Sequence, residues 1–380
     1  MRVYFVQPKN FNRTEKRTNP FFDPIIEVCE ENGIEYLIYN PGRKSRTGYP
    51  RKKVRDSRHL RRFVSFFSKY FGRFIPGGAE YDIDRMAGRI WNLLTFGRDR
   101  ADIYITVADE LYGALPGLNP KARVVDVMHG IIYPGHEKYL APEGGPSEYM
   151  LSCSEREAWV TGVGYREFFI KAQKNEEWVK KHVAVIGDVC GHFTMDKPCD
   201  SERKHLFISL QVSNGGTDDD NAMRLEKVLV FMRTVSPLGE WNGLPVIIKH
   251  HPRYAGRYDI SPLKREFPKA CFVDDSLRKI AEYSVVHVTI DSTTAFDMAA
   301  FGVPTFFIGS NDPQAHSDLA YACDIWNCSF KYPYWGWPFE KLIELVKEDS
   351  RQVSKVLYAW FEKFYSPIDK NEILKGIQGC

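Results

Sequence analysis

The segment Val285–Ile308 constrains the fold more than any other part of the chain. A β-branched run at Val285–Ile290 leads into the polar cluster Asp291–Thr294. A helical stretch follows at Ala295–Phe301, and after a Gly-Val-Pro turn comes a second apolar strand, Thr305–Ile308. Strands alternating with helices are typical of βαβ units, so this segment predicts one strand–helix–strand unit of a parallel sheet.

The polar cluster stands where the helix of that unit would begin, outside the carboxyl end of the strand. Unpaired backbone N–H groups and the helix dipole make this position suitable for an anionic phosphate. One Asp or Ser there is also the usual N-cap of a helix. Because a cap needs only one such residue, the run predicts a phosphate or nucleotide site that includes Ser292, Thr293 and Thr294.

The same alternation extends along the chain and predicts an α/β protein with parallel sheets covered by helices on both faces. A length of 380 residues suggests two domains. The polar, turn-rich stretch Gly187–Arg203 is interpreted as a linker, which gives domains at about 1–190 and 204–350. The remaining residues, 351–380, continue a predicted helix, Phe339–Phe364, that could pack back on the first domain. Further strands are predicted at Arg2–Val6, Tyr36–Tyr39, Ile103–Val107, Val124–Met128, Val183–Ile186, Leu206–Leu210 and Pro245–Ile248.

The composition is that of an ordinary soluble protein, with a net charge of +3. No apolar run of about 18 residues and no apolar signal-peptide core occur, so a cytoplasmic protein is expected. The eight cysteines are scattered without a C-x-x-C pair. This spacing indicates free thiols in a reducing compartment and argues against a structural zinc site.

One segment, 43–74, departs from this charge balance because basic residues precede a run of aromatic residues at near-helical spacing. A solvated basic loop leading into a core helix would explain it. A patch for an anionic membrane surface or a diphosphate-linked acceptor would explain it equally. Nucleic acid is not expected as a partner, because the rest of the chain is charge-balanced and carries no nucleic-acid motif.

The loop Ser209–Asn221 follows the first strand of the second domain and contains three adjacent acids, Asp218, Asp219 and Asp220. Thr217 or one of the acids would cap a helix that begins near Ala222. Three neighbouring carboxylates repel one another, so another of them could serve as base or nucleophile. Capping alone and a catalytic role both remain open. Gln211, in the same loop, is assigned to nucleotide-sugar binding.

A second strand end carries Lys249, His250, His251, Pro252 and Arg253. Two imidazoles and two cations suit a phosphate or a leaving group that needs charge stabilisation. A zinc site would need a third ligand that the sequence does not supply. A histidine satisfied by the backbone is the alternative.

In the first domain, His129 and Gly130 follow a predicted strand, and Glu110 follows the strand before it. Ligands of open α/β sheets bind at the carboxyl ends of the strands, which would place these residues on the acceptor side of a cleft. A local loop role is equally open for each of them.

In order, these features resemble a GT-B glycosyltransferase with two Rossmann-like domains and a cleft between them. The chain resembles the bacterial capsule and lipopolysaccharide enzymes that use CMP-activated ulosonic acids, namely bacterial sialyltransferases and β-Kdo transferases. Their acidic, His-Pro and Ser/Thr motifs correspond to Asp218–Asp220, His251-Pro252 and Ser292–Thr294. The acidic motif departs from the usual pattern, because Asn221 stands where a glycine is expected. The segment HGIIYPGH favours Kdo over sialic acid as the donor sugar.

The resemblance implies that His251 and the Ser292–Thr294 hydroxyls hold the CMP phosphate without a metal or other cofactor. It also implies that one aspartate is the base of an inverting enzyme or the nucleophile of a retaining one. The expected partners are a CMP-activated sugar and a lipid-linked or oligosaccharide acceptor, at the inner face of the membrane. Two alternatives remain. One is a CDP-glycerol-type glycerophosphotransferase with His129 and His251 as the catalytic pair, and the other is a non-catalytic module for an anionic glycan or nucleotide.

Overall fold

The computed structural model divides the chain into two compact units. Unit 1 comprises Met1–Gly191 and Phe364–Cys380, and unit 2 comprises His192–Lys363. The structure describes the chain with the exception of residues 9–10, 12–13, 42–46, 73–79, 108–110, 133–138, 141–146, 148–149, 151–155, 174, 192–202, 212–217, 236–239, 242, 251–258, 309–324 and 380.

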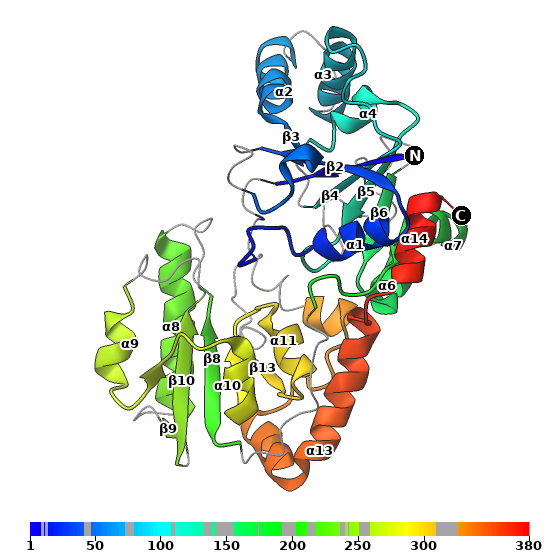
Figure 1. Cartoon of the computed structure of the whole chain (residues 1–380). Helices are drawn as coiled ribbons and strands as arrows, with labels where there is room; N and C mark the ends of the chain where they lie inside the picture. The colour runs from blue at the N-terminus through cyan, green and yellow to red at the C-terminus, as the bar shows by residue number, and fades with distance from the viewer. Residues whose placement is uncertain are drawn as a thin grey trace. The chain divides into compact units, whose positions relative to one another are not determined.

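Unit 1 is built on a seven-stranded parallel sheet with strand order β3-β2-β1-β4-β5-β6-β7 (Figure 1). The strand Ile103–Val107 is buried along its whole length, as expected of a central strand in a sheet covered on both faces. The strands are β1 (Arg2–Val6), β2 (Glu35–Asn40), β3 (Val54–Asp56), β4 (Ile103–Val107), β5 (Arg123–Val127), β6 (Arg156–Val160) and β7 (Val183–Val185).

Helices cover both faces of this sheet and create two cores. One core joins the sheet to α1 (Asp23–Glu31) and α14 (Lys370–Gln378). The other joins it to α2 (Arg58–Phe71), α3 (Glu80–Leu94) and α4 (Leu115–Leu118). The remaining helices of unit 1 are η2 (Arg51–Lys53), α6 (Val163–Gln173) and α7 (Glu176–His182).

The helices α3 and α4 approach each other unusually closely. A Cβ on Gly88 would lie 2.1 Å from the carbonyl oxygen of Ala114, and a Cβ on Gly117 would lie 2.1 Å from that of Arg85. Only glycine permits this backbone contact, which fixes the side of α3 that faces the protein interior.

Unit 2 contains a second sheet with the parallel strand order β11-β10-β8-β12-β13, to which β9 adds an antiparallel edge on β10. Its strands are β8 (His205–Leu210), β9 (Glu240–Trp241), β10 (Leu244–His250), β11 (Cys271–Phe272), β12 (Ser284–Thr289) and β13 (Thr305–Phe307). Its helices are α8 (Asp218–Val235), α9 (Ser261–Glu266), α10 (Leu277–Tyr283), α11 (Thr294–Ala300), η5 (Ile325–Ser329) and α13 (Phe339–Phe364).

The predicted strand–helix–strand unit at Val285–Ile308 is present as β12, α11 and β13. The turn after α11 depends on Gly302, which has φ +65°, and a Cβ there would lie 2.4 Å from Oγ of Ser354 on α13. The glycine therefore permits both the left-handed turn and the close packing of α13.

Two boundaries differ from the sequence-based prediction. Residues 351–363 belong to unit 2 as the end of α13, while 364–380 return to unit 1. There Ile373 and Ile377 of α14 are fully buried in the core. The helix α8 begins at Asp218 rather than near Ala222, so the prediction of a later start was wrong.

Candidate functional site

Three neighbouring strand ends of unit 2 bring most of the described candidate residues to one edge of the sheet. Strand β8 pairs on one side with β10, which ends at Lys249 and His250, and on the other with β12, which leads into Ser292–Thr294. Gln211 directly follows β8. This edge is where parallel α/β sheets bind ligands.

The loop after β12 is held by a set of local hydrogen bonds. Oγ of Ser292 accepts from the backbone N–H of Thr294 at 3.2 Å and donates to Oγ1 of Thr294 at 2.9 Å. Thr293, at the N-cap of α11, makes no capping bond with its side chain and is exposed. The Ser292 and Thr294 hydroxyls thus shape the loop, and the Thr293 hydroxyl faces solvent.

Gln211 supports this loop rather than standing apart from it. Its Oε1 accepts a hydrogen bond from the backbone N–H of Asp291 at 2.7 Å and another from Oγ1 of Thr289 at 3.2 Å. The side chain of Asp291 is held as well, because its Oδ1 lies 3.3 Å from Nη1 of Arg224 on α8. Gln211 and Arg224 together fix the position of the backbone that precedes Ser292.

Lys249 is the most unusual residue at this edge. Its relative exposure is 8%, and in the described part of the chain its ammonium has neither an ion pair nor a hydrogen bond. The side chain is therefore mostly covered by protein, and its ammonium is not among the fully buried polar atoms without a partner in the described part of the chain, so it can meet an anion from solvent. At the next position, burial lowers the pKa of His250, Lys264 and Lys249 lower it further, and Asp274 opposes them. The lowered pKa favours the neutral form of the His250 imidazole.

A chain of buried polar side chains crosses the same face of the sheet, and we call it the polar belt. Lys249 and Ser209 are register partners, as are Thr305 and His287, so their side chains point to one face. Oγ of Ser209 lies 2.8 Å from Nε2 of His287 and donates to Oγ1 of Thr289 at 3.1 Å. Nδ1 of His287 lies 3.0 Å from Oγ1 of Thr305, whose backbone N–H donates to the Tyr332 hydroxyl at 2.6 Å.

His287 is neutral at the centre of this belt. It is completely buried, and burial lowers its pKa to about 3. A neutral imidazole has one donor and one acceptor nitrogen, which matches its two hydroxyl partners. The belt connects the aromatic interior at Tyr332 to Gln211, and through it to the loop at Asp291.

Sequence analysis missed the polar belt, although a signal for it exists. Polar residues occur at every second position of otherwise apolar strands, with His287 and Thr289 on β12 and Ser209 near the end of β8. Period-two spacing places such residues on one face of a sheet. Arg224 gave no comparable signal, because nothing in its local sequence distinguishes it from other helical arginines.

Several predicted site residues lie outside the described residues, namely His251, Arg253, Glu110 and the side chains of Asp218, Asp219 and Asp220. The backbone of the three acids forms the first turn of α8. Among the described residues, no group of three His, Cys, Asp or Glu side chains is arranged to hold a metal ion.

In unit 1, His129 follows β5 and is exposed. The edge of its ring faces Phe11 at 5.8 Å and Phe21 at 6.5 Å between centroids. A Cβ on Gly130 would meet no atom within 4 Å, so the space beside it is open. Both residues thus lie at an accessible strand end.

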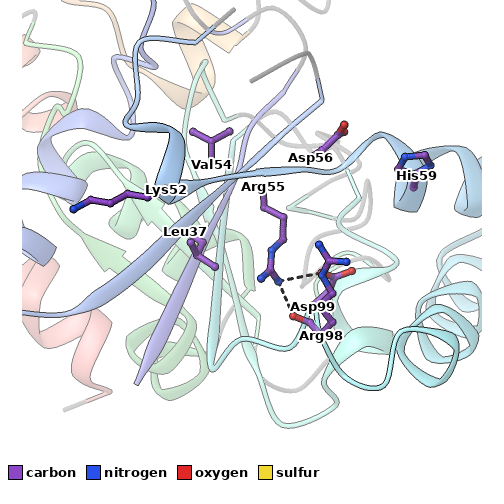
Figure 2. A pocket seen from close by; sticks show the side chains of 8 residues that line it. All are labelled: Leu37, Lys52, Val54, Arg55, Asp56, His59, Arg98 and Asp99. Carbon is purple, nitrogen blue, oxygen red and sulfur yellow. Dashed lines mark hydrogen bonds and ion pairs between the residues drawn. The ribbon is translucent and has the colours of Figure 1, made fainter. Parts of the chain in front are cut away.

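Unit 1 also contains a basic pocket of about 510 Å³ at its edge strand β3 (Figure 2). Both acids of the pocket form ion pairs, Asp56 with Arg58 and Asp99 with Arg55. Lys52 and Arg98 have no such partner in the described part of the chain, whereas His59 lies close enough to Asp56 to help lower the pKa of that carboxyl. The lining residues are Leu37, Lys52, Val54, Arg55, Asp56, His59, Arg98 and Asp99.

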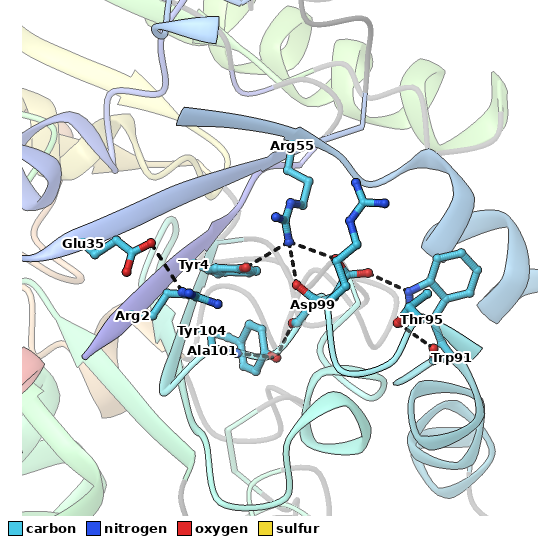
Figure 3. Close-up of polar contacts among 10 residues, drawn as sticks. Arg2, Tyr4, Glu35, Arg55, Trp91, Thr95, Asp99, Ala101 and Tyr104 are labelled. Atoms are coloured by element: carbon cyan, nitrogen blue, oxygen red, sulfur yellow. Dashed lines mark hydrogen bonds and ion pairs between the residues drawn. The ribbon is translucent and has the colours of Figure 1, made fainter. Parts of the chain in front are cut away.

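The wall of this pocket is held by a buried network around Asp99 (Figure 3). Nη1 of Arg55 lies 3.3 Å from Oδ1 of Asp99 and donates to the Tyr4 hydroxyl at 3.0 Å. Nε1 of Trp91 donates to Oδ2 of Asp99 at 2.8 Å. The network ties β1, β3 and α3 together, so Arg55 and Asp99 are structural residues.

Comparisons with known proteins place the fold. No family model matches the chain, and no curated protein matches its sequence. Among solved structures, the glycotransferase of kitacinnamycin superposes with a TM-score of 0.52 at 12% identity, covering 99% of this chain and 98% of that one. UDP-GlcNAc 2-epimerase from Neisseria meningitidis, bound to UDP-GlcNAc, gives 0.51 at 10% identity over 100% of both chains. The lipopolysaccharide outer core galactosyltransferase WaaB gives 0.50 at 11% identity, covering 100% of this chain and 99% of that one.

These matches extend over whole chains and both units. The fold is of the GT-B type. The predicted fold class of two parallel-sheet α/β domains is thereby confirmed.

Proposed function

We propose that this protein is a glycosyltransferase that takes its sugar from a nucleotide-linked donor bound at the carboxyl edge of the unit 2 sheet. The observation that carries the proposal is Lys249, which is in register with Ser209. The residue is 8% exposed, and its ammonium has no ion pair or hydrogen bond in the described part of the chain. A phosphate supplies the negative charge that this position lacks. Two similar structures are of glycosyltransferases, which supports transfer as the reaction.

In this proposal the donor phosphate accepts hydrogen bonds from the Lys249 ammonium and the Thr293 hydroxyl. As the glycosidic bond to the phosphate breaks, negative charge develops on the leaving oxygen, and Lys249 stabilises it. Gln211 and Arg224 keep the loop in place before the donor arrives, which reduces the ordering cost of binding.

The donor we propose is CMP-Kdo. The support is the order of the acidic, His-Pro and Ser/Thr motifs at Asp218–Asp220, His251-Pro252 and Ser292–Thr294. If configuration is retained, an aspartate attacks the anomeric carbon while CMP leaves, and the acceptor hydroxyl then displaces the aspartate. If it is inverted, the aspartate removes the proton of the acceptor hydroxyl as that oxygen attacks. In either case the reaction needs no metal.

The acceptor we propose is a lipid-linked or oligosaccharide intermediate of a bacterial surface polysaccharide, reached from the cytoplasmic side. His129 and Gly130 support an acceptor site in unit 1, because they lie at an accessible strand end. No described helix is long and apolar enough to cross a membrane.

The first experiment compares CMP, CDP, UDP, TDP and GDP in a thermal-shift assay, followed by calorimetry with the best nucleotide. Lys249→Met should weaken its binding about 10- to 100-fold, the usual worth of a charge-assisted hydrogen bond. The matched control is Lys279→Met, which removes an exposed lysine of unit 2 that pairs with Asp275 at 2.9 Å. Equal affinity of both variants and wild type would refute the donor site. Stabilisation by UDP or TDP alone would keep the transferase and refute CMP-Kdo.

Epimerisation of a UDP-sugar is a second candidate, favoured by the match to UDP-GlcNAc 2-epimerase over the whole of both chains. The two reactions differ in their need for an acceptor. A transferase forms a new glycoside only when an acceptor is present, whereas an epimerase converts its sugar nucleotide alone. NMR of the incubated sugar nucleotide without acceptor distinguishes them.

A further inference from the structure

Exposed apolar side chains are concentrated on one part of unit 1. In the described part of the chain, ten large apolar side chains are exposed, and seven of them lie on α2, on α3 or in the turn after α3. We call this set the α2–α3 surface. Its members are Phe66, Tyr70, Phe71, Met86, Leu93, Leu94 and Phe96.

The two helices lie side by side (Figure 1), and two contacts join them. The rings of Phe63 and Trp91 are 5.4 Å apart, and the Ser68 hydroxyl donates to Asp84 at 2.5 Å. The interior side of α3 is marked by Gly88 against α4. Met86 and Leu93 lie roughly 140–160° from Gly88 around the helix, at about 100° per residue, and so face away from the protein.

Phe96 supports a role that is not structural. Its side chain is 97% exposed, so it contributes no packing. Its φ of 53° is in the left-handed region, where Asn or Gly is favoured and a bulky residue is strained. Neither burial nor backbone conformation explains a phenylalanine here, whereas contact with an apolar environment outside the protein does.

Cations accompany the apolar residues of α2, whereas two acids of α3 already have partners, since Asp82 pairs with Arg85 and Asp84 accepts from Ser68. Helix α2 contains no acid, and its exposed positions include Arg62 and Lys69, whose ammonium lies 5.5 Å from the Tyr70 ring. Arg89 on α3 is also exposed. Other basic residues of the segment are committed to the fold. Arg61, for example, donates to the Gln7 carbonyl, and burial lowers its pKa to about 10.

The basic pocket lies at the base of this surface. His59, in the first turn of α2, lines it, and Arg98, two residues after Phe96, lines it from the other side. With Asp56 and Asp99 already paired, Lys52 and Arg98 are left to bind an anion. A volume of about 510 Å³ accommodates a phosphate group.

We propose that the α2–α3 surface docks on an anionic lipid bilayer. Aromatic and leucine side chains enter the boundary between headgroups and acyl chains, while Arg62, Lys69 and the basic pocket bind lipid phosphates. Amphipathic helices with aromatic residues and long cations associate with membranes in this way. The inference deepens the proposed function, since a lipid-linked acceptor lies in the same membrane, but donor binding in unit 2 is measured separately.

The first test is co-sedimentation with phosphatidylcholine vesicles that contain phosphatidylglycerol. Wild type should sediment with them at low salt and much less at high salt, because screening weakens the electrostatic part. The double variant Phe66→Ser/Tyr70→Ser, and separately Phe96→Asn, should each partition at least about tenfold more weakly, the loss expected for one large apolar side chain. Val163→Ser, which removes an exposed apolar residue of α6, should bind like wild type.

The charge arm uses Arg62→Gln/Lys69→Gln, with Lys171→Gln on α6 as its control. Each lost cation should weaken binding about fivefold. Wild type that stays in the supernatant at low salt would overturn the proposal, as would apolar variants that sediment like wild type. A lipid-free dimer abolished by Phe66→Ser would assign the surface to a second copy of the chain instead. Nucleotide-induced thermal shifts should be the same in all these variants, so a failure here is distinguishable from a failure of the donor site.

Discussion

The two units differ in whether a charged side chain with little exposure has a partner. In unit 1 the buried carboxylate of Asp99 is bonded by Arg55 and by the Trp91 indole. In unit 2 the ammonium of Lys249, a residue that is 8% exposed, has no ion pair or hydrogen bond in the described part of the chain and lies beside the polar belt. A paired charge holds strands together, whereas an unpaired one is explained by a ligand that supplies its counter-charge.

The largest expected effect concerns the paired charge. Asp99→Ala leaves Arg55 without its carboxylate and should lower the free energy of unfolding by about 2–3 kcal/mol. This is below the value for a fully buried pair, because the Arg55 side chain is 27% exposed. Asp82→Ala breaks an exposed ion pair with Arg85 and should cost under about 0.5 kcal/mol. Urea unfolding of both variants measures the difference, and equal losses would contradict the structural role of Asp99.

The next effect is a pH dependence located in unit 2. The pKa of His287 is about 3 in the folded protein and near 6.5 in an unfolded chain, so the unfolded state binds a proton first as the pH falls. The stabilisation is fully present above pH 6.5 and is lost towards pH 3, with a slope of up to about 1.4 kcal/mol per pH unit. In His287→Gln, the free energy of unfolding measured by urea titration should change less between pH 6.5 and pH 5 than it does in wild type. If the free energy of unfolding of this variant falls with pH as steeply as that of wild type, groups other than His287 cause the acid sensitivity.

A smaller effect, of opposite sign to that of Asp99→Ala, is expected at Lys249. Without nucleotide, Lys249→Met should raise the free energy of unfolding by about 1 kcal/mol, because a mostly covered lysine without a described partner is replaced by an apolar side chain of similar length. With nucleotide the order should reverse, since only wild type gains the binding free energy. Melting curves of wild type and Lys249→Met, each recorded with and without nucleotide, test both expectations. Destabilisation of the ligand-free variant would mean that the ammonium has a structural role after all.

The smallest effect lies on the surface of unit 1. Phe96→Asn relieves the left-handed strain and should raise the free energy of unfolding by about 0.5–1 kcal/mol. A variant that is more stable yet binds vesicles more weakly would separate function from folding at this position. If Phe96→Asn is less stable than wild type, the Phe96 ring makes packing contacts, and its exposure is then not evidence of a role in binding.

Much of the fold was predictable because most residues of its central strands are apolar. The run Ile103–Val107 matches β4 residue for residue, and Phe339–Phe364 matches α13. The short edge strand β3 was missed because its residues, Val-Arg-Asp, carry only one apolar side chain. Strand β6 was missed for a similar reason, since it begins with two charged residues, Arg156 and Glu157, and only three apolar residues follow.

The candidate site was predictable only where it follows a strand directly. Lys249, His250 and Ser292–Thr294 could be placed at the sheet edge from strand order alone. The polar belt depends on which strands are neighbours, and a sequence does not state that β8 lies between β10 and β12. For segment 43–74 the sequence left open a basic loop leading into a core helix and a patch for an anionic surface. The structure places Arg58, Arg61 and Arg62 within the helix α2.

The position of α14 has a consequence for the order in which the protein is made. Ile373 and Ile377 complete the core of unit 1, but the ribosome adds them after the whole of unit 2, residues 192–363. At about 5–20 residues per second, unit 1 waits roughly ten to thirty seconds with part of its core uncovered. During that interval Trp159, against which Gly376 of α14 will pack, is accessible to chaperones. Synthesis of the last helix is thus the step that ends chaperone access to the first unit.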